Sequence, residues 1–283
     1  MTGTVLTAAA LSAVFHAGWN ILARQHNRPG ECLAAMAVAT ASLCLVVLPV
    51  CGLPRFEAWP WLAAASITNI LYLRMLGRAY AQHDFCVVYG IVRATVPAIL
   101  FLLGAFYLGE KTEWTGQAGL AIVTASILIF AIAGGAAYRL GYKTIARSTS
   151  VGLILASAIF LDVQGIRAAG NSFMDVVAYA AASSLLTAAG ILAVTAVNGG
   201  NVISVLLNDA ARCYAGAALL LVAYLLGMWA YAQGPIGLVA PIRESSILVA
   251  GALAVLILRD NVTHGQWAAM VLATVGIVLV QSG

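Results

Sequence analysis

The chain has 283 residues, of which 63% are hydrophobic and only 8% are charged, and its formal net charge is +4. A mean hydropathy of +0.98 leaves too little polar surface to solvate a globular domain. These values exclude a soluble protein and predict an all-α integral membrane protein with the lipid bilayer as its surroundings. The basic residues lie in short loops, so the positive charge indicates membrane topology and no nucleic-acid partner.

Hydrophobic stretches long enough to cross a bilayer as a helix recur along the whole chain, separated by short breaks rich in Pro, Gly and charged residues. Ten transmembrane helices are predicted, at residues 2–23, 32–53, 59–80, 86–107, 114–134, 150–169, 173–197, 210–232, 236–258 and 265–282. The segment 1–23 lacks a basic leader and a small-residue cleavage site, so we expect a retained helix there.

Two segments of the first half recur in the second half in the same order. Tyr80-Ala81-Gln82 returns as Tyr231-Ala232-Gln233, and residues 12–15 resemble residues 157–160. An Arg also aligns with an Arg, at positions 93 and 243. Duplication therefore predicts a first five-helix repeat at 1–137, a polar linker at 138–150 and a second repeat at 151–283. Because each half has an odd number of spans, the second copy is inverted in the membrane.

The distribution of Lys and Arg between alternate loops predicts the orientation. More of them lie near the odd-numbered loops than near the even-numbered ones, which favours both termini outside the cell. The residues near the odd-numbered loops are Arg24, Arg28, Arg78, Arg139, Lys143, Arg147, Arg212 and Arg259, against Arg55, Lys111 and Arg167 near the even-numbered ones.

Three motifs around the fourth and fifth predicted helices resemble the EamA family of the drug/metabolite transporter superfamily. They are Pro97, Leu108-Gly109-Glu110 and Gln117-Ala118-Gly119. The second copy differs, with Arg259-Asp260 in place of Gly-Glu and no proline that corresponds to Pro97. The resemblance covers nearly the whole chain, and by length and architecture it is greatest to the aromatic amino-acid exporters.

This resemblance implies a secondary transporter of the cell (inner) membrane, often an exporter of amino acids or other small metabolites. In the family the last helices of each half form a packing surface that also serves dimers. We expect a monomer to suffice, because one chain holds both halves, with a homodimer as the alternative.

Polar residues inside the predicted helices are the candidate substrate-binding groups, because each costs a few kcal/mol in hydrocarbon. On the first helix His16, Trp19 and Asn20 share one face and would line a cavity with hydrogen-bonding groups and an aromatic wall. The alternative is interhelical hydrogen bonding that fixes the packing.

The sixth predicted helix carries Asp162 and Gln164 at the matching place. A lone carboxylate at that depth either pairs with an Arg or is protonated during part of a transport cycle. The second possibility makes Asp162 a candidate for proton coupling, and Glu244 is the other candidate.

Arg93, Arg243 and Glu244 form the main charge constellation. Neighbouring residues on a helix point about 100° apart, so we expect Arg243 and Glu244 not to satisfy one another. Either Arg would bind a substrate carboxylate near the axis between the halves. The alternative is a buried charge network with Glu244 and Asp162 that locks the bundle.

Tyr80, Tyr89 and Tyr231 supply rings and hydroxyl groups in the same region, which suits an aromatic or amphipathic substrate. Tyrosines near helix ends also belong to the interfacial belt of membrane proteins, and that alternative stays open.

The sequence therefore predicts an alternating-access transporter that binds a small-molecule substrate, most of all an amino acid, in a central cavity. A lipid-linked metabolite flippase and a drug exporter are the alternatives within the superfamily. An intramembrane enzyme is disfavoured, since motifs for nucleotide binding, zinc proteases and serine hydrolases are absent. A channel is disfavoured because prolines within the helices, an internal repeat and intramembrane charges suit alternating access better than a continuous pore. No cofactor or metal is expected, and the five cysteines lack metal-type spacing.

Overall fold

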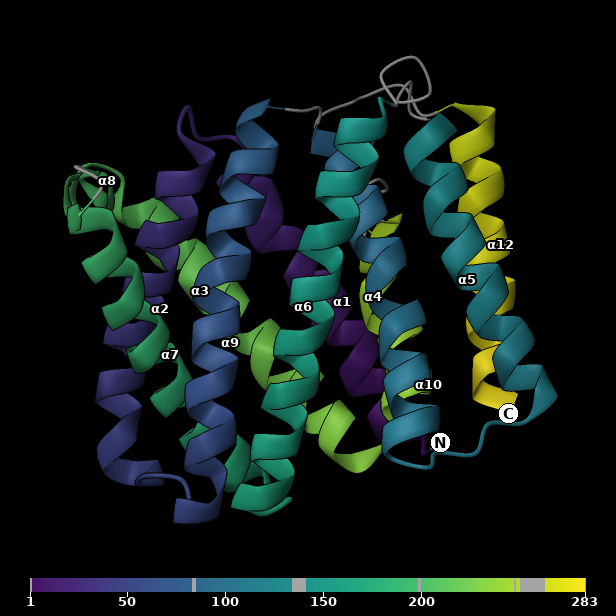
Figure 1. The fold of residues 1–283 in the computed structure, drawn as a ribbon, viewed down its shortest axis with the longest axis horizontal. Helices are drawn as coiled ribbons and strands as arrows, with labels where there is room; N and C mark the ends of the chain where they lie inside the picture. Colours follow the sequence, from purple (N-terminus) through teal and green to yellow (C-terminus); the bar gives the residue numbers. More distant parts are fainter. Residues whose placement is uncertain are drawn as a thin grey trace.

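The computed structural model describes residues 2–82, 85–133, 141–197, 200–246, 248–249 and 263–282. Every long element in this part of the chain is an α-helix, and together they form a bundle in which the two termini lie at the same end (Figure 1). The helices are α1 (Gly3–Arg24), α2 (Pro29–Cys51), α3 (Trp59–Gln82), α4 (Phe85–Tyr107), α5 (Trp114–Ala133), α6 (Tyr142–Ala169), α7 (Phe173–Val197), α8 (Val202–Asn208), α9 (Ala210–Gln233), α10 (Ile236–Glu244) and α12 (His264–Ser282), with a 3₁₀ turn, η1, at Phe56–Ala58.

Among the described residues, seven helices are long and apolar enough to cross a membrane. The prediction of an all-helical membrane protein is therefore confirmed. The number of ten spans and the inverted repeat stay predictions. The predicted ninth helix, 236–258, is interrupted, because α10 ends at Glu244 and a turn follows at Ser245. Residues 247 and 250–258 of that span lie outside the described residues, as do Arg139, Arg259 and Asp260.

Two differences from the predicted helices have local causes. Helix α6 begins at Tyr142 and not at residue 150, because its polar first turns continue the apolar helix without a break. Residues 142–150 of the predicted linker are therefore helical, and residues 138–140 lie outside the described part. The short helix α8 was not predicted. It begins where the Asn201 side chain accepts a hydrogen bond of 2.9 Å from the Ser204 backbone N–H.

The most extensive helix contacts join the first part of the chain to the second. Helix α1 packs on α9, α2 on α7, α3 on α6, α4 on α10, and α5 on α12. The last pair is very close, since a Cβ atom on Gly119 would lie 2.5 Å from the Val280 backbone nitrogen. Only glycine permits this approach, which is typical of membrane helices that lack a hydrophobic drive to associate.

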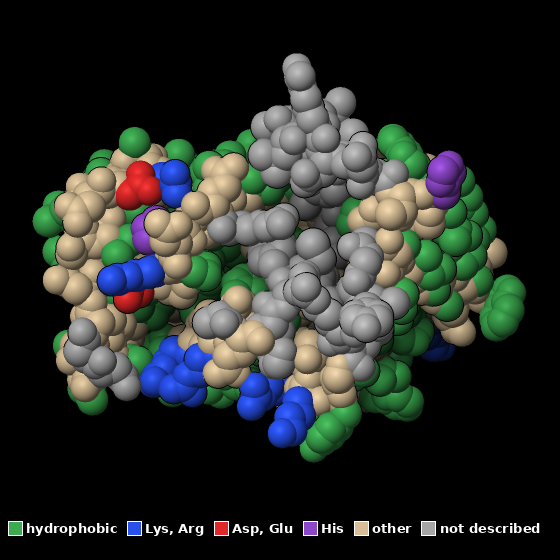
Figure 2. Space-filling view, turned by 90° about the horizontal axis from the view of Figure 1, so that it is seen from above, with side chains coloured by type: hydrophobic (Ala, Val, Ile, Leu, Met, Phe, Trp, Pro, Cys, Tyr) green, Lys and Arg blue, Asp and Glu red, His purple; other side chains and the backbone are tan. Residues whose placement is uncertain are grey.

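Basic side chains gather at the end of the bundle opposite the termini. Figure 2 looks onto this end and shows Lys and Arg side chains along one edge of it. Exposed basic residues occur at the end of α3 and the start of α6, among them Arg78, Lys143 and Arg147. The orientation with the termini outside the cell stays a prediction, and it follows from placing this end in the cytoplasm.

The Gly109-Glu110 motif fixes the start of α10. Gly109 has a φ of +67°, a backbone conformation that glycine adopts readily. The Glu110 carboxylate then accepts hydrogen bonds from the backbone N–H groups of Ile236 at 3.0 Å and Gly237 at 3.3 Å. These N–H groups have no partner within α10, so Glu110 acts as a cap supplied by a distant loop.

Arg167, at the end of α6, holds the neighbouring end of α9. Its guanidinium donates to the backbone oxygens of Tyr231 at 3.2 Å and Gly234 at 3.3 Å, and it lies 3.7 Å from the Glu110 carboxylate. An acid and a base from different elements thus bind both sides of the α9–α10 break. We call Glu110 and Arg167 the terminal clamp.

Replacing Glu110 by Ala should lower the free energy of unfolding by about 1–2 kcal/mol, because the α10 N–H groups lose their acceptor. The measurement is thermal unfolding of the purified protein in detergent. The exposed neighbour Glu113 provides the control, and Glu113→Ala should change stability by less than about 0.5 kcal/mol. Equal effects of the two substitutions would contradict the capping role.

Candidate functional site

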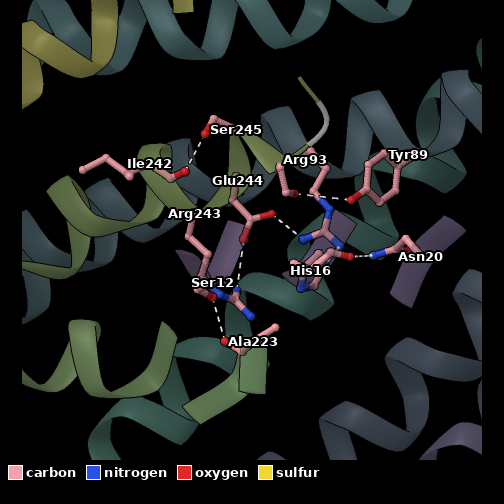
Figure 3. Close-up of polar contacts among 11 residues, drawn as sticks. Ser12, His16, Asn20, Tyr89, Arg93, Ala223, Ile242, Arg243, Glu244 and Ser245 are labelled. Carbon is pink, nitrogen blue, oxygen red and sulfur yellow. Dashed lines mark hydrogen bonds and ion pairs between the residues drawn. The ribbon is translucent and has the colours of Figure 1, made fainter. Parts of the chain in front are cut away.

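A buried carboxylate joins two arginines at the centre of the bundle. Glu244, at the end of α10, lies 2.5 Å from Arg93 of α4 through its Oε2 atom and 3.1 Å from Arg243 through Oε1 (Figure 3). Arg93 is 1% exposed and Glu244 is fully buried. Such a group is stable only when paired, so the three residues form one unit, which we call the arginine–glutamate cluster.

The expectation that Arg243 and Glu244 do not satisfy one another was wrong. Helix α10 ends at Glu244, and Ser245 begins a turn. The long Arg243 side chain reaches round this helix end to the adjacent carboxylate, so the angle between the two Cα–Cβ directions does not decide the contact.

His16 of α1 extends the cluster. The Arg93 Nη2 group donates to His16 Nε2 at 2.5 Å. Because a guanidinium has no acceptor, Nε2 must carry the lone pair and the imidazole is neutral. The His16 ring contacts Trp19 edge to face with centroids 4.9 Å apart. Asn20 donates instead to the His16 backbone oxygen at 2.8 Å, a bond within its own helix.

A cavity of about 140 Å³ lies beside the cluster, between helices of both parts of the chain. Five of the predicted site residues line it: His16, Trp19, Arg93, Asp162 and Arg243. Polar groups that were not predicted also line it, and the rest of the wall is mainly apolar. The unpredicted polar residues are Thr40, Asn69, Tyr72, Ser183, Ser184, Thr187 and Tyr224.

Asp162 lies in the cavity wall on α6, with 2% of its surface exposed. Its two oxygens accept hydrogen bonds from neutral groups, the Tyr179 hydroxyl at 3.2 Å and the Asn69 amide at 3.3 Å. No Lys or Arg of the described residues forms an ion pair with it. Of the two predicted alternatives, pairing with an Arg is therefore not observed.

The other predicted site residues lie outside the cavity lining. The Arg93 guanidinium carbon lies over the Tyr89 ring, 4.7 Å from the ring centre. The Arg243 guanidinium carbon lies 5.8 Å from the centre of the Tyr231 ring. Glu244 contacts both arginines but does not line the cavity. Tyr80 packs against the buried core, and Gln164 is half-buried on α6. These side chains support or neighbour the site without facing the cavity.

A signal for the missed residues was present in the sequence. Asn69 and Tyr72 stand three residues apart on one face of an apolar helix, as His16 and Trp19 do on α1. Tyr224 stands alone in the apolar run of α9. An amide inside a membrane helix, like a charge there, needs a hydrogen-bonding partner and therefore also indicates a polar site.

Replacing Glu244 by Gln should destabilise the protein by about 3–5 kcal/mol, because two buried guanidinium groups then share no counter-charge. Unfolding temperature and the yield of folded protein in detergent measure this effect. The matched control is Glu57→Gln at an exposed position, which should leave both unchanged. A Glu244→Gln protein as stable as the control would show that the cluster does not hold the bundle together.

No family model matches the chain, but a curated protein and a solved structure resemble it. A probable terminal-alkyne amino-acid exporter of Streptantibioticus cattleyicolor is 28% identical over 139 residues, which are 48% of this chain and 43% of that protein. The match therefore spans less than half of the curated relative. A solved crystal structure of a protein without further description aligns over 98% of this chain and 96% of its own, with a TM-score of 0.74 and 16% identity, and thus shares the fold.

Proposed function

We propose that the chain is a secondary transporter that exports amino acids or similar small metabolites, and that it is a member of the EamA family. The central cavity would be its substrate site. The observation that carries this proposal is a small cavity inside a membrane bundle, lined by buried charges from α4, α6 and α10. The exporter relative supports the amino-acid class.

The helix contacts support alternating access between two related halves. If α1 to α5 correspond in order to α6, α7, α9, α10 and α12, exchanging the halves converts the α1–α9 contact into the α6–α3 contact. The α2–α7, α4–α10 and α5–α12 contacts convert into themselves. A pair of inverted repeats packed about a twofold axis has this property, and rocking of one against the other would open the cavity to either side.

The terminal clamp supplies the contacts that such a motion would break at one end. Glu110 and Arg167 bind the α9–α10 junction on the side of the termini. Both side chains are partly exposed, so water can replace their hydrogen bonds when the junction moves.

The two acids proposed for proton coupling have different surroundings. Glu244 is held by two guanidinium groups and does not line the cavity. Asp162 faces the cavity and has only neutral hydrogen-bond donors. The proposal therefore assigns proton exchange to Asp162, and transport by Asp162→Asn should no longer respond to an imposed proton gradient, measured as export against a pH difference in vesicles. A response equal to that of the unchanged protein would remove this assignment.

The size of the cavity favours small metabolites over the other substrates of the superfamily. Sites for drug-sized molecules typically enclose about 300–1,000 Å³. The cavity here has about 140 Å³. A flippase for lipid-linked molecules or a multidrug exporter would need a larger site.

Counterflow in proteoliposomes tests the proposed function. Vesicles preloaded with unlabelled L-phenylalanine, L-tryptophan, L-threonine or a polyamine should accumulate the labelled form of at least one amino acid. Trp19→Ala, which removes part of the cavity wall, should reduce this exchange at least about tenfold. Trp267→Ala on α12 is the matched control, because Trp267 is 53% exposed and lies outside the cavity. Equal accumulation in protein-free vesicles for every amino acid would overturn the proposal.

A further inference from the structure

We infer that the cavity binds its substrate as a zwitterion, with the substrate carboxylate on Arg243 and the substrate ammonium group on Asp162. This inference rests on the proposed function and adds the two groups that a substrate must carry. Its basis is that two residues of opposite charge, Arg243 and Asp162, line the same cavity.

Arg243 is the cation with capacity left for a ligand. In Arg93 both terminal amino groups are occupied, Nη1 by Glu244 and Nη2 by His16. In Arg243 only Nη1 has such a partner, Glu244. The Arg243 guanidinium also neighbours the Tyr231 side chain, which carries no negative charge, and no second acid of the described residues pairs with this guanidinium. Since Arg243 is 6% exposed and lines the cavity, an anion in the cavity would meet this group.

Asp162 is the complementary pole. Its oxygens accept hydrogen bonds from the neutral Tyr179 and Asn69 side chains, and the Tyr224 hydroxyl lies beside the same carboxylate. A carboxylate has about four acceptor sites, so room for an ammonium donor remains. A buried carboxylate without a cation is costly, and an ammonium group entering the cavity would relieve this cost. The Asn69 and Tyr179 donors fix the direction of the carboxylate, so the pole is formed before the ligand arrives.

The buried charges balance only over the whole site. Arg93, Arg243, Glu244 and Asp162 together carry no net charge in their ionised forms. The arginine–glutamate cluster alone carries one excess positive charge, and Asp162, which lines the same cavity, carries one negative charge. A ligand with no net charge but with both ionic groups satisfies the two poles at once. A ligand with one ionic group leaves the other pole unpaired and desolvated.

The remaining wall leaves room for a substrate side chain without fixing it. Trp19 and Tyr72 supply aromatic surface, and several aliphatic residues complete the lining. Small hydroxyl-bearing residues on α7 lie among them. Recognition by two ionic poles beside a mainly apolar wall predicts selection for the amino-acid head group, with wider tolerance for the side chain.

Competition by matched analogues tests the inference in the unchanged protein. The labelled amino acid with the strongest counterflow is challenged with unlabelled amino acid, with the amine that lacks its carboxylate and with the acid that lacks its amino group. For L-phenylalanine these are phenethylamine and 3-phenylpropanoate. Both singly charged analogues should compete at least about tenfold more weakly than the amino acid.

The outcomes separate the inference from the proposed function. If either analogue competes as well as the amino acid, the zwitterion site is overturned while the exporter stands. If no amino acid exchanges at all, both fall. Weak competition by both analogues supports the two poles.

Variants of the protein assign each pole to its residue. Asp162→Asn should raise the inhibitory concentration of the amino acid at least about tenfold relative to that of 3-phenylpropanoate, because only the ammonium group loses its partner. Asp209→Asn, in a surface ion pair outside the cavity, should leave this ratio unchanged. A ratio that does not shift in a folded Asp162→Asn protein would overturn the assignment of the ammonium group.

Gly227 offers a test of the Arg243 pole that keeps every charge. A Cβ atom on Gly227 of α9 would lie 2.6 Å from Arg243 Nε, so Gly227→Ala should displace the guanidinium. Competition by the amino acid and by 3-phenylpropanoate should weaken, while that by phenethylamine should not. Equal weakening for all three compounds would indicate a general loss of packing and would overturn the carboxylate assignment.

Discussion

The carboxylate of Glu244 is the constraint on which the rest of the site depends. The guanidinium groups of Arg93 and Arg243 are buried away from water, and the Glu244 carboxylate forms an ion pair with both. Because the desolvation of each ion is costly, none of the three can move without exposing the others to an apolar environment. The cluster thereby fixes α4 against α10, and through His16 it also positions α1. The cavity is the space beside this fixed point.

Much of the fold could be predicted from the sequence, because the length of an apolar run and the Pro, Gly and charged residues at its ends are local signals. Helix α7 begins and ends at the predicted residues. The start of α6 was missed, because its first turns are polar and the apolar run of the helix begins only after them. Helix α8 is too short to give a hydrophobic signal.

The site could be predicted only in part, for a physical reason. Burial of a charge in an apolar run is visible in the sequence, and it identified Arg93, Asp162 and Arg243 as candidates. Which groups pair depends on helices that meet only in the fold. The sequence therefore did not separate Glu244, which two arginines hold, from Asp162, which Asn69 and Tyr179 hold. Nor did it indicate that Glu110 would cap a helix 126 residues away.

The pairing of Arg93 with Glu244 has a consequence for biosynthesis. The two residues are 151 positions apart in the chain. At about 5–20 residues per second, roughly 8–30 s pass between the synthesis of the arginine and that of its counter-ion. During that interval α4 has a membrane-depth cation without its acid, although His16 has already been made. The first five helices are therefore made before the charge that stabilises them exists. Their insertion into the bilayer is a step separate from the final packing of the bundle.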